Sequence, residues 1–219
     1  GANLSDVDMS GTDFKVANLS QIVARGANLT EADLRGANLV DADLRGAIAV
    51  RAQLEKSRLL RVNCSSANLF GVNLRSTKLA QVNLSWANVG SANLSDTEIV
   101  DSTLTHMDLR GSRLYGARLE GVDLKYSDLS GADLTNARIV ASDLSGVNLN
   151  SATLTGAFFR NTKMAGVDLR KTNISRMRMI NVDLSDSDLT QLDIRKAKIL
   201  DARLCRTRID SRVANEGCQ

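Results

Sequence analysis

Apolar residues recur at every fifth position of this chain, from Leu4 to Ile209. Forty-two positions follow this spacing, and 27 of them are leucine, while most others are isoleucine, methionine, valine or phenylalanine. We call these positions the centres. The residue two before a centre is also small or apolar, as in Ala27-Asn28-Leu29. Each repeat therefore has two inward positions, and the other three face water.

A period of five fits neither the 3.6-residue period of an α-helix nor the 2-residue period of a strand. The chain must therefore turn once in every repeat. Thirteen of the fifteen glycines share one phase, two residues after a centre, where a corner would need permissive backbone dihedrals. Since each repeat can contact only its neighbours, the pattern predicts one elongated domain.

Blocks such as Ala32-Asp33-Leu34-Arg35-Gly36 and Ala132-Asp133-Leu134 resemble the repeats of the pentapeptide-repeat family. The resemblance implies an all-β fold, a right-handed quadrilateral β-helix with four repeats per coil and about 10 coils. With strands about 4.8 Å apart, the rod would be roughly 50 Å long. We expect one solenoid over residues 1–209 and an irregular polar tail over 210–219. Because the pattern is already present at Gly1, we expect a fragment or a processed chain.

Four repeats per coil would stack residues twenty apart into columns and divide the outward positions among four sides. The side centred on residues 19, 39, 59 and onward to 199 differs from the others. Valine, isoleucine or leucine directly follows seven of the 42 centres, and six of the seven are on this side. The six aliphatic residues are Val40, Leu60, Val100, Val140, Ile180 and Leu200.

The position directly before the centre is basic on this same side six times, out of ten in the whole chain. The six basic residues are Arg58, Lys78, Arg118, Arg138, Arg178 and Lys198. Exposed aliphatic residues along a rod indicate a binding surface, and neighbouring cations would be relieved by a partner's carboxylates. The alternative is that outward β-branched residues stack only to stabilise the sheet. Glu98, Glu120, Phe158 and Arg160 interrupt the two columns.

Trp86, His106 and Tyr126 are spaced twenty residues apart at one corner phase, which predicts an aromatic ladder. Exposed tryptophan and tyrosine are favoured in binding hot spots. Stacking that only orders a corner is the alternative. His106 is the single histidine of the chain and by itself indicates neither catalysis nor a metal.

The sequence favours a non-enzymatic protein without a metal or cofactor. It contains no phosphate loop, no catalytic triad signature and no metal-ligand spacing. Carboxylates directly before the centres are interpreted as structural repeat positions; they include Asp33, Asp43, Asp123, Asp128 and Asp133.

The three cysteines do not suggest a disulfide framework. Cys64 occupies a centre, Cys205 is expected to point outward, and Cys218 lies in the tail. A reducing compartment is therefore favoured, namely the cytoplasm of a bacterium, or a host cytosol if the chain is part of a larger secreted effector. No apolar run has the length of a membrane span.

Two centres, Ala24 and Ala49, are undersized. We expect Ile22 to fill the volume left by Ala24. At Ala49 we expect a local bulge that turns Ile48 inward.

These patterns lead to a preferred function and two alternatives. The preferred function is a rod that presents the aliphatic and basic side to a protein partner, which we expect to be acidic. The resemblance also implies a topoisomerase-binding protein that protects gyrase from quinolones by mimicking DNA, although this chain carries a net charge of +3. The third is nucleic-acid binding by the basic C-terminal end, where residues 160–219 hold 13 Lys and Arg against 8 Asp and Glu, but sparse aromatic residues disfavour it. Open solenoid ends also predict an end-to-end homodimer.

Overall fold

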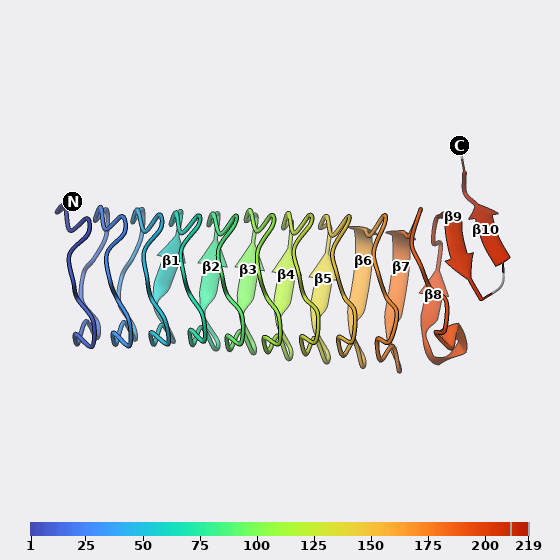
Figure 1. Cartoon of the computed structure of the whole chain (residues 1–219), viewed down its shortest axis with the longest axis horizontal. Coiled ribbons are helices and arrows are strands. Elements are labelled where there is room, and N and C mark those ends of the chain that lie inside the picture. The colour runs from blue at the N-terminus through green and yellow to red at the C-terminus, as the bar shows by residue number, and fades with distance from the viewer. Residues whose placement is uncertain (211, 219) are drawn as a thin grey trace.

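The chain winds into an elongated parallel β-solenoid in the computed structural model, which describes residues 1–210 and 212–218. Residues twenty apart pair in parallel along the rod, beginning with Asn3 and Val23. Four repeats therefore complete one coil, as the resemblance implies. The two termini lie at opposite ends of the rod (Figure 1).

Eight strands form one parallel sheet along a single side of the rod, in the order β1 to β8 (Figure 1). They are β1 (Arg58–Leu60), β2 (Lys78–Ala80), β3 (Glu98–Val100), β4 (Arg118–Glu120), β5 (Arg138–Val140), β6 (Phe158–Lys163), β7 (Arg178–Asp183) and β8 (Lys198–Leu200). About seven turns separate the first strand from the last. The coils before Arg58 are joined by isolated bridges instead.

The core is one continuous stack of aliphatic side chains inside the coils. Every centre from Ala24 to Leu189 is buried, together with the residue two before each. The corners lie where the sequence places them, because the position two after a centre has a left-handed backbone, with φ 67° at Gly36 and 63° at Trp86. The predicted alternation of two inward and three outward positions is confirmed.

Asparagine and aspartate before the centres stabilise the turns on the other three sides. Their Oδ1 accepts the backbone N–H two residues later, at 3.1 Å from Gly90 to Asn88 and 2.9 Å from Ser130 to Asp128. Some also bridge coils, since Asn88 donates to Asn68 at 3.2 Å. This geometry agrees with the structural interpretation of these carboxylates and amides.

The regular repeat ends before Ile209, so the count of 42 repeats is too high. A short 3₁₀ helix, η1 (Ile194–Lys196), replaces the expected repeat, and its centre Ile194 is only partly buried. The last expected centres, Leu204 and Ile209, belong to a strand that pairs with the returning chain. This strand therefore has an antiparallel partner, while Arg203 and Arg208 still bridge Asp183 and Asp188 of the previous coil in parallel.

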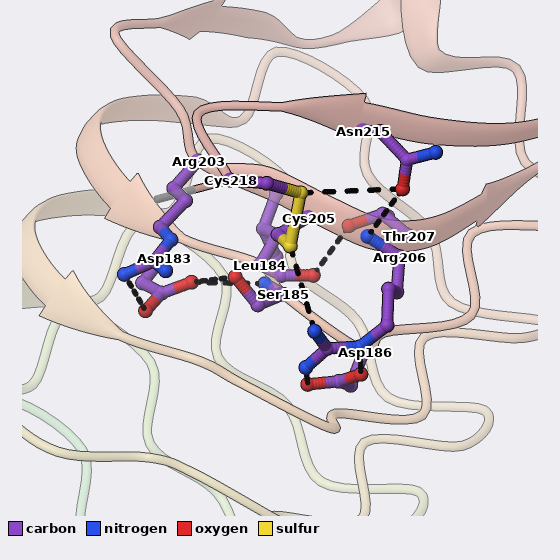
Figure 2. The surroundings of a disulfide bond; sticks show 10 residues. All are labelled: Asp183, Leu184, Ser185, Asp186, Arg203, Cys205, Arg206, Thr207, Asn215 and Cys218. Carbon is purple, nitrogen blue, oxygen red and sulfur yellow. Dashed lines mark hydrogen bonds and ion pairs between the residues drawn. A yellow bond between two sulfur atoms is a disulfide. The ribbon is translucent and has the colours of Figure 1, made fainter.

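The C-terminal segment is not an irregular tail, because β9 (Leu204–Ile209) and β10 (Arg212–Glu216) form an antiparallel hairpin at the end of the rod (Figure 1). A disulfide joins Cys205 to Cys218 and closes the hairpin (Figure 2). The prediction of no disulfide was therefore wrong, and so was the outward Cys205, which is buried. Because this disulfide is present, the cysteines no longer support the expectation of a reducing compartment.

The two undersized centres behave differently. Ile22 is buried in the core cluster beside the fully buried Ala24, as expected. Ile48 is 42% exposed and bridges Asn28 and Asn68 in regular register, so the predicted inward turn of Ile48 is wrong. The small Ala49 is accommodated without a bulge.

Candidate protein-interaction face

The predicted aliphatic and basic residues lie on one side of the rod. We call this side the strand face and define it by β1–β5, β8 and the first three residues of β6 and β7. Arg58 pairs with Lys78, Arg118 with Arg138, and Arg178 with Lys198, so that the basic residues form one column. The aliphatic residues form a second column two residues further along each strand. Val40 precedes β1 in this column, since the N–H of Asp41 bonds to the carbonyl of Leu60.

The strand face begins where the residue before the centre is no longer an asparagine whose side chain closes a turn. Asn38, one coil before β1, still accepts the N–H of Val40 on Oδ1 at 3.3 Å and makes only an isolated bridge to Arg58. From Arg58 onward the residue before the centre cannot close that turn, and three-residue strands replace single bridges. Long and β-branched side chains favour the extended backbone. The outward residues of this face are therefore not required for turn formation.

The aliphatic column is less exposed than the sequence suggests. Leu200, at the end of the sheet, is exposed at 42%, whereas Val40, Leu60, Val100 and the other members are half-buried. Strands about 4.8 Å apart allow each aliphatic side chain to cover part of the next. This column therefore stabilises the sheet as well as offering an apolar surface.

The basic column is divided into three pairs of neighbouring cations. Glu98 separates the first pair from the second, and its Oε2 lies 2.8 Å from Lys78 Nζ. Phe158 separates the second from the third, and its ring lies 4.8 Å from the guanidinium of Arg138 and 5.5 Å from that of Arg178. The residues that appear as interruptions in the sequence thus relieve part of the repulsion within the column.

Several cations of this column form no ion pair within the described residues, although Glu98 is paired with Arg118 across the neighbouring strands. In the described part of the chain, the side chains of Arg58, Arg118 and Lys198 make no ion pair or hydrogen bond. The strand face as a whole carries seven Lys and Arg against two Glu. It therefore presents an excess of positive charge to solvent.

Arginines on the side opposite the strand face are neutralised within their own repeats. Arg110 donates from Nε and Nη2 to both carboxylate oxygens of Asp108, at 2.9 and 2.6 Å, and Arg170 holds Asp168 in the same way. These guanidinium groups lower the pKa of Asp108 and of Asp168 below the ordinary value of an aspartate. The positive charges of Arg110 and Arg170 are thus already neutralised by Asp108 and Asp168.

A hollow of about 400 Å³ interrupts the strand face near its N-terminal end, and the sequence interpretation missed it. Ala80 forms its floor between the larger Leu60 and Val100 in the same column. The signal was present, because Ala80 is the one small residue in that column between Val40 and Leu200.

The aromatic ladder forms as predicted. Trp86 stacks on His106 with ring centroids 4.0 Å apart and an interplanar angle of 11°, and His106 lies 5.3 Å from Tyr126. Gly146 is the next residue in this corner column and leaves space for the Tyr126 ring, because a Cβ there would lie only 2.6 Å from Cδ1 of Tyr126. Trp86 and Tyr126 remain about 60% exposed. One whole side of the rod separates this corner from the strand face, so the structure does not join the two predicted sites.

The described residues offer little for catalysis. No group of three or more His, Cys, Asp or Glu in residues 1–210 and 212–218 could hold a metal ion. Burial raises the pKa of the Cys64 thiol to about 12, which keeps it protonated. Across the same residues the structure contains no helix with the length and hydropathy of a membrane span.

The sequence profile of pentapeptide repeats matches the chain in eight copies. They cover residues 2–39, 14–48, 37–75, 50–85, 77–114, 104–139, 112–150 and 142–179. None of the curated proteins matches the chain significantly in sequence.

Solved structures share the fold. One is HetL, a pentapeptide repeat protein involved in heterocyst differentiation regulation from the cyanobacterium Nostoc sp. strain PCC 7120. It has a TM-score of 0.62 and 24% identity over 98% of this chain and 92% of HetL. Another is a trypsin-treated variant of QnrB1, a plasmid-mediated fluoroquinolone resistance protein, with a TM-score of 0.50 and 18% identity over 96% of this chain and 90% of QnrB1.

Proposed function

The chain belongs to the pentapeptide-repeat family, and we propose that it is a non-enzymatic interaction rod whose strand face binds an acidic protein partner. The proposal rests on one observation: neighbouring cations, of which Arg58, Arg118 and Lys198 form no ion pair in the described residues, lie beside an aliphatic column on one sheet. Like charges at strand spacing destabilise a sheet. A partner's carboxylates would remove this repulsion and bury the half-exposed aliphatic side chains at the same time.

The position of the cations supports this function over a purely structural one. Sheet stability alone would favour alternating charges across strands, as at Lys78 and Glu98. Arg118 and Arg138 instead occupy directly paired positions. Such an arrangement costs stability in the free protein and is typical of a surface used for binding.

Nucleic-acid binding and quinolone protection are the alternatives. The likeness to QnrB1 concerns the fold, and a cationic strand face is the opposite of a DNA mimic, because DNA carries one negative charge per about 1.7 Å of helix axis. Nucleic-acid readers usually combine basic grooves with aromatic stacking, and Phe158 is the single aromatic residue directed outward on the strand face. A gyrase supercoiling assay with and without a quinolone tests the second alternative.

The experiment compares charge reversals on the strand face with equal charge reversals elsewhere. Arg118 lies on the strand face and Arg113 on the preceding side, and both are exposed, lie directly before a centre and form no ion pair among the described residues. Fluorescein-labelled poly-L-glutamate serves as the probe, and fluorescence anisotropy at low salt measures binding. We expect Arg118→Glu combined with Arg138→Glu to weaken binding by about tenfold or more. Arg113→Glu combined with Lys171→Glu makes the same change of charge away from the strand face and should change binding by less than about twofold.

Two outcomes would overturn the proposal. In the first, the strand-face variant and the charge-matched Arg113→Glu and Lys171→Glu variant weaken polyglutamate binding equally, so that binding depends only on net charge. In the second, a duplex DNA probe binds the wild-type protein more tightly than polyglutamate and loses binding in the strand-face variant. The second outcome would favour nucleic-acid binding. Circular dichroism of each variant checks that the β-structure is retained.

A further inference from the structure

The hollow over Ala80 combines an apolar floor with a basic rim. Leu60 and Ala80 supply apolar surface, whereas Lys56, Arg58 and Lys78 stand around it. Its volume of about 400 Å³ lies within the range of protein ligand sites. Ser76, at the corner beside it, completes the rim.

The hollow exists because one residue of a column is small. Leu60, Ala80 and Val100 occupy equivalent positions in β1, β2 and β3, and the alanine lacks the volume that its neighbours fill. A leucine at the same position would continue the aliphatic column without a gap. The concavity is thus a local feature of the sequence, because other coils place larger side chains at this position.

The rim cations differ in how far they are neutralised. Lys78 makes an ion pair with Glu98 at 2.8 Å. Lys56 and Arg58 have no ion pair or side-chain hydrogen bond among the residues that the structure describes. Two positive charges beside an apolar floor therefore remain available for a ligand.

We propose that this hollow anchors a partner segment in which a large apolar side chain is followed by carboxylates. The apolar side chain would lie on Leu60 and Ala80, and the carboxylates would pair with Arg58 and Lys56. This inference rests on the proposed function of the strand face and specifies what the partner presents there. Charge complementarity selects an acidic peptide, and the apolar floor disfavours a free phosphate, which would gain nothing from Leu60 and Ala80.

The test uses three short peptides and methyl NMR of the full chain. The probes are acetyl-GLEEG-amide, its glutamine counterpart acetyl-GLQQG-amide, and acetyl-GSEEG-amide, which lacks the apolar side chain. We expect the first peptide to shift the methyl signals of Leu60 and Ala80, with the other two at least about fivefold weaker. Inorganic phosphate is the fourth probe and should leave these methyl signals in place.

Matched variants separate filling of the hollow from general effects. Ala80→Leu fills it with a side chain of the size already present at Leu60, and we expect peptide binding to fall at least about tenfold. Ala165→Leu makes the same change at the equivalent repeat position of another side and should leave binding unchanged. Circular dichroism checks that both variants fold.

Equal shifts from all three peptides, shifts caused by phosphate, or unchanged peptide binding in Ala80→Leu would each overturn the anchoring role. Failure here is distinguishable from failure of the proposed function. If the hollow is not an anchor, the Arg118→Glu and Arg138→Glu variant still loses polyglutamate binding. If the proposed function fails, that variant retains it.

Discussion

The strand face and the opposite side of the rod share one period and one core, yet different side chains hold their backbones. On the opposite side, Asn88 and Asp128 close turns with their Oδ1 atoms, and Arg110 neutralises Asp108. On the strand face, the corresponding positions hold cations that close no turn, and β1–β8 pair directly. On the strand face the residues before the centres are not needed to form turns, so these outward positions are available for binding.

The same comparison explains why charge is distributed unevenly around the rod. An aspartate that accepts a backbone N–H attracts an arginine two residues later in its own repeat, as Asp168 does with Arg170. The strand face has no such aspartate from Arg58 onward, so its cations are not neutralised in this way. Positive charge therefore remains on one side although the whole chain carries only +3.

The largest expected effect comes from the core that the two sides share. Phe159 lies under the strand face and Leu149 under the opposite side, and both are fully buried. We expect Phe159→Ala to cost about 3–5 kcal/mol of unfolding free energy and Leu149→Ala about 2–5 kcal/mol. Urea unfolding followed by circular dichroism measures both. A cost near zero for either variant would contradict a shared core.

A smaller effect should separate the outward positions of the two sides. Asn88→Ala removes two hydrogen bonds, to Gly90 and Asn68, and should cost about 1–2 kcal/mol. Arg118→Ala removes no such contact and should change stability by less than about 0.5 kcal/mol. The same urea titration compares them. Asn88→Asp keeps the acceptor for Gly90 and is the control, which should recover part of the loss.

The smallest effect concerns pH. Hydrogen bonds from Arg110 lower the pKa of Asp108 in the folded protein, below its ordinary value of 3.8. The pair therefore contributes stability above pH 3.8 and loses it as the pH falls through the lower folded pKa. We expect Asp108→Asn to destabilise the protein at pH 7 and to lose this difference at low pH. Unfolding titrations at pH 7 and pH 3 measure it, and a constant difference would show that Asp108 acts without its charge.

The five-residue period was sufficient to predict the corners, and with the four repeats per coil that the family resemblance implies it predicted both columns of the strand face. It also placed Trp86, His106 and Tyr126 in register, because any residues twenty apart must stack in such a fold. The binding roles of these residues stay predictions. The half-burial of Val100 and its neighbours in the column was not predicted. The repeat phase shows that these side chains point outward, but how far each one covers the next depends on the distance between strands.

The end of the chain could not be predicted from the period. Cys205 and Cys218 are joined through an antiparallel hairpin, whose returning strand β10 reverses the chain direction and lies outside the five-residue repeat. Arg206 reaches back to Asp186 with two bonds of 2.6 Å and fastens this hairpin to the previous coil (Figure 2). Spacing along the sequence carries no information on such a reversal.

Photo-crosslinking reports which side of the rod contacts a partner and therefore separates the strand face from the other sides. A benzoylphenylalanine residue replaces Val100 on the strand face or, as the control, Ala165 on another side, and irradiated extracts of the source cells are analysed by mass spectrometry. We expect a protein adduct from position 100 alone, which Arg118→Glu and Arg138→Glu together abolish. The same adducts from both positions, or an adduct from position 165 alone, would contradict the strand face as the binding surface.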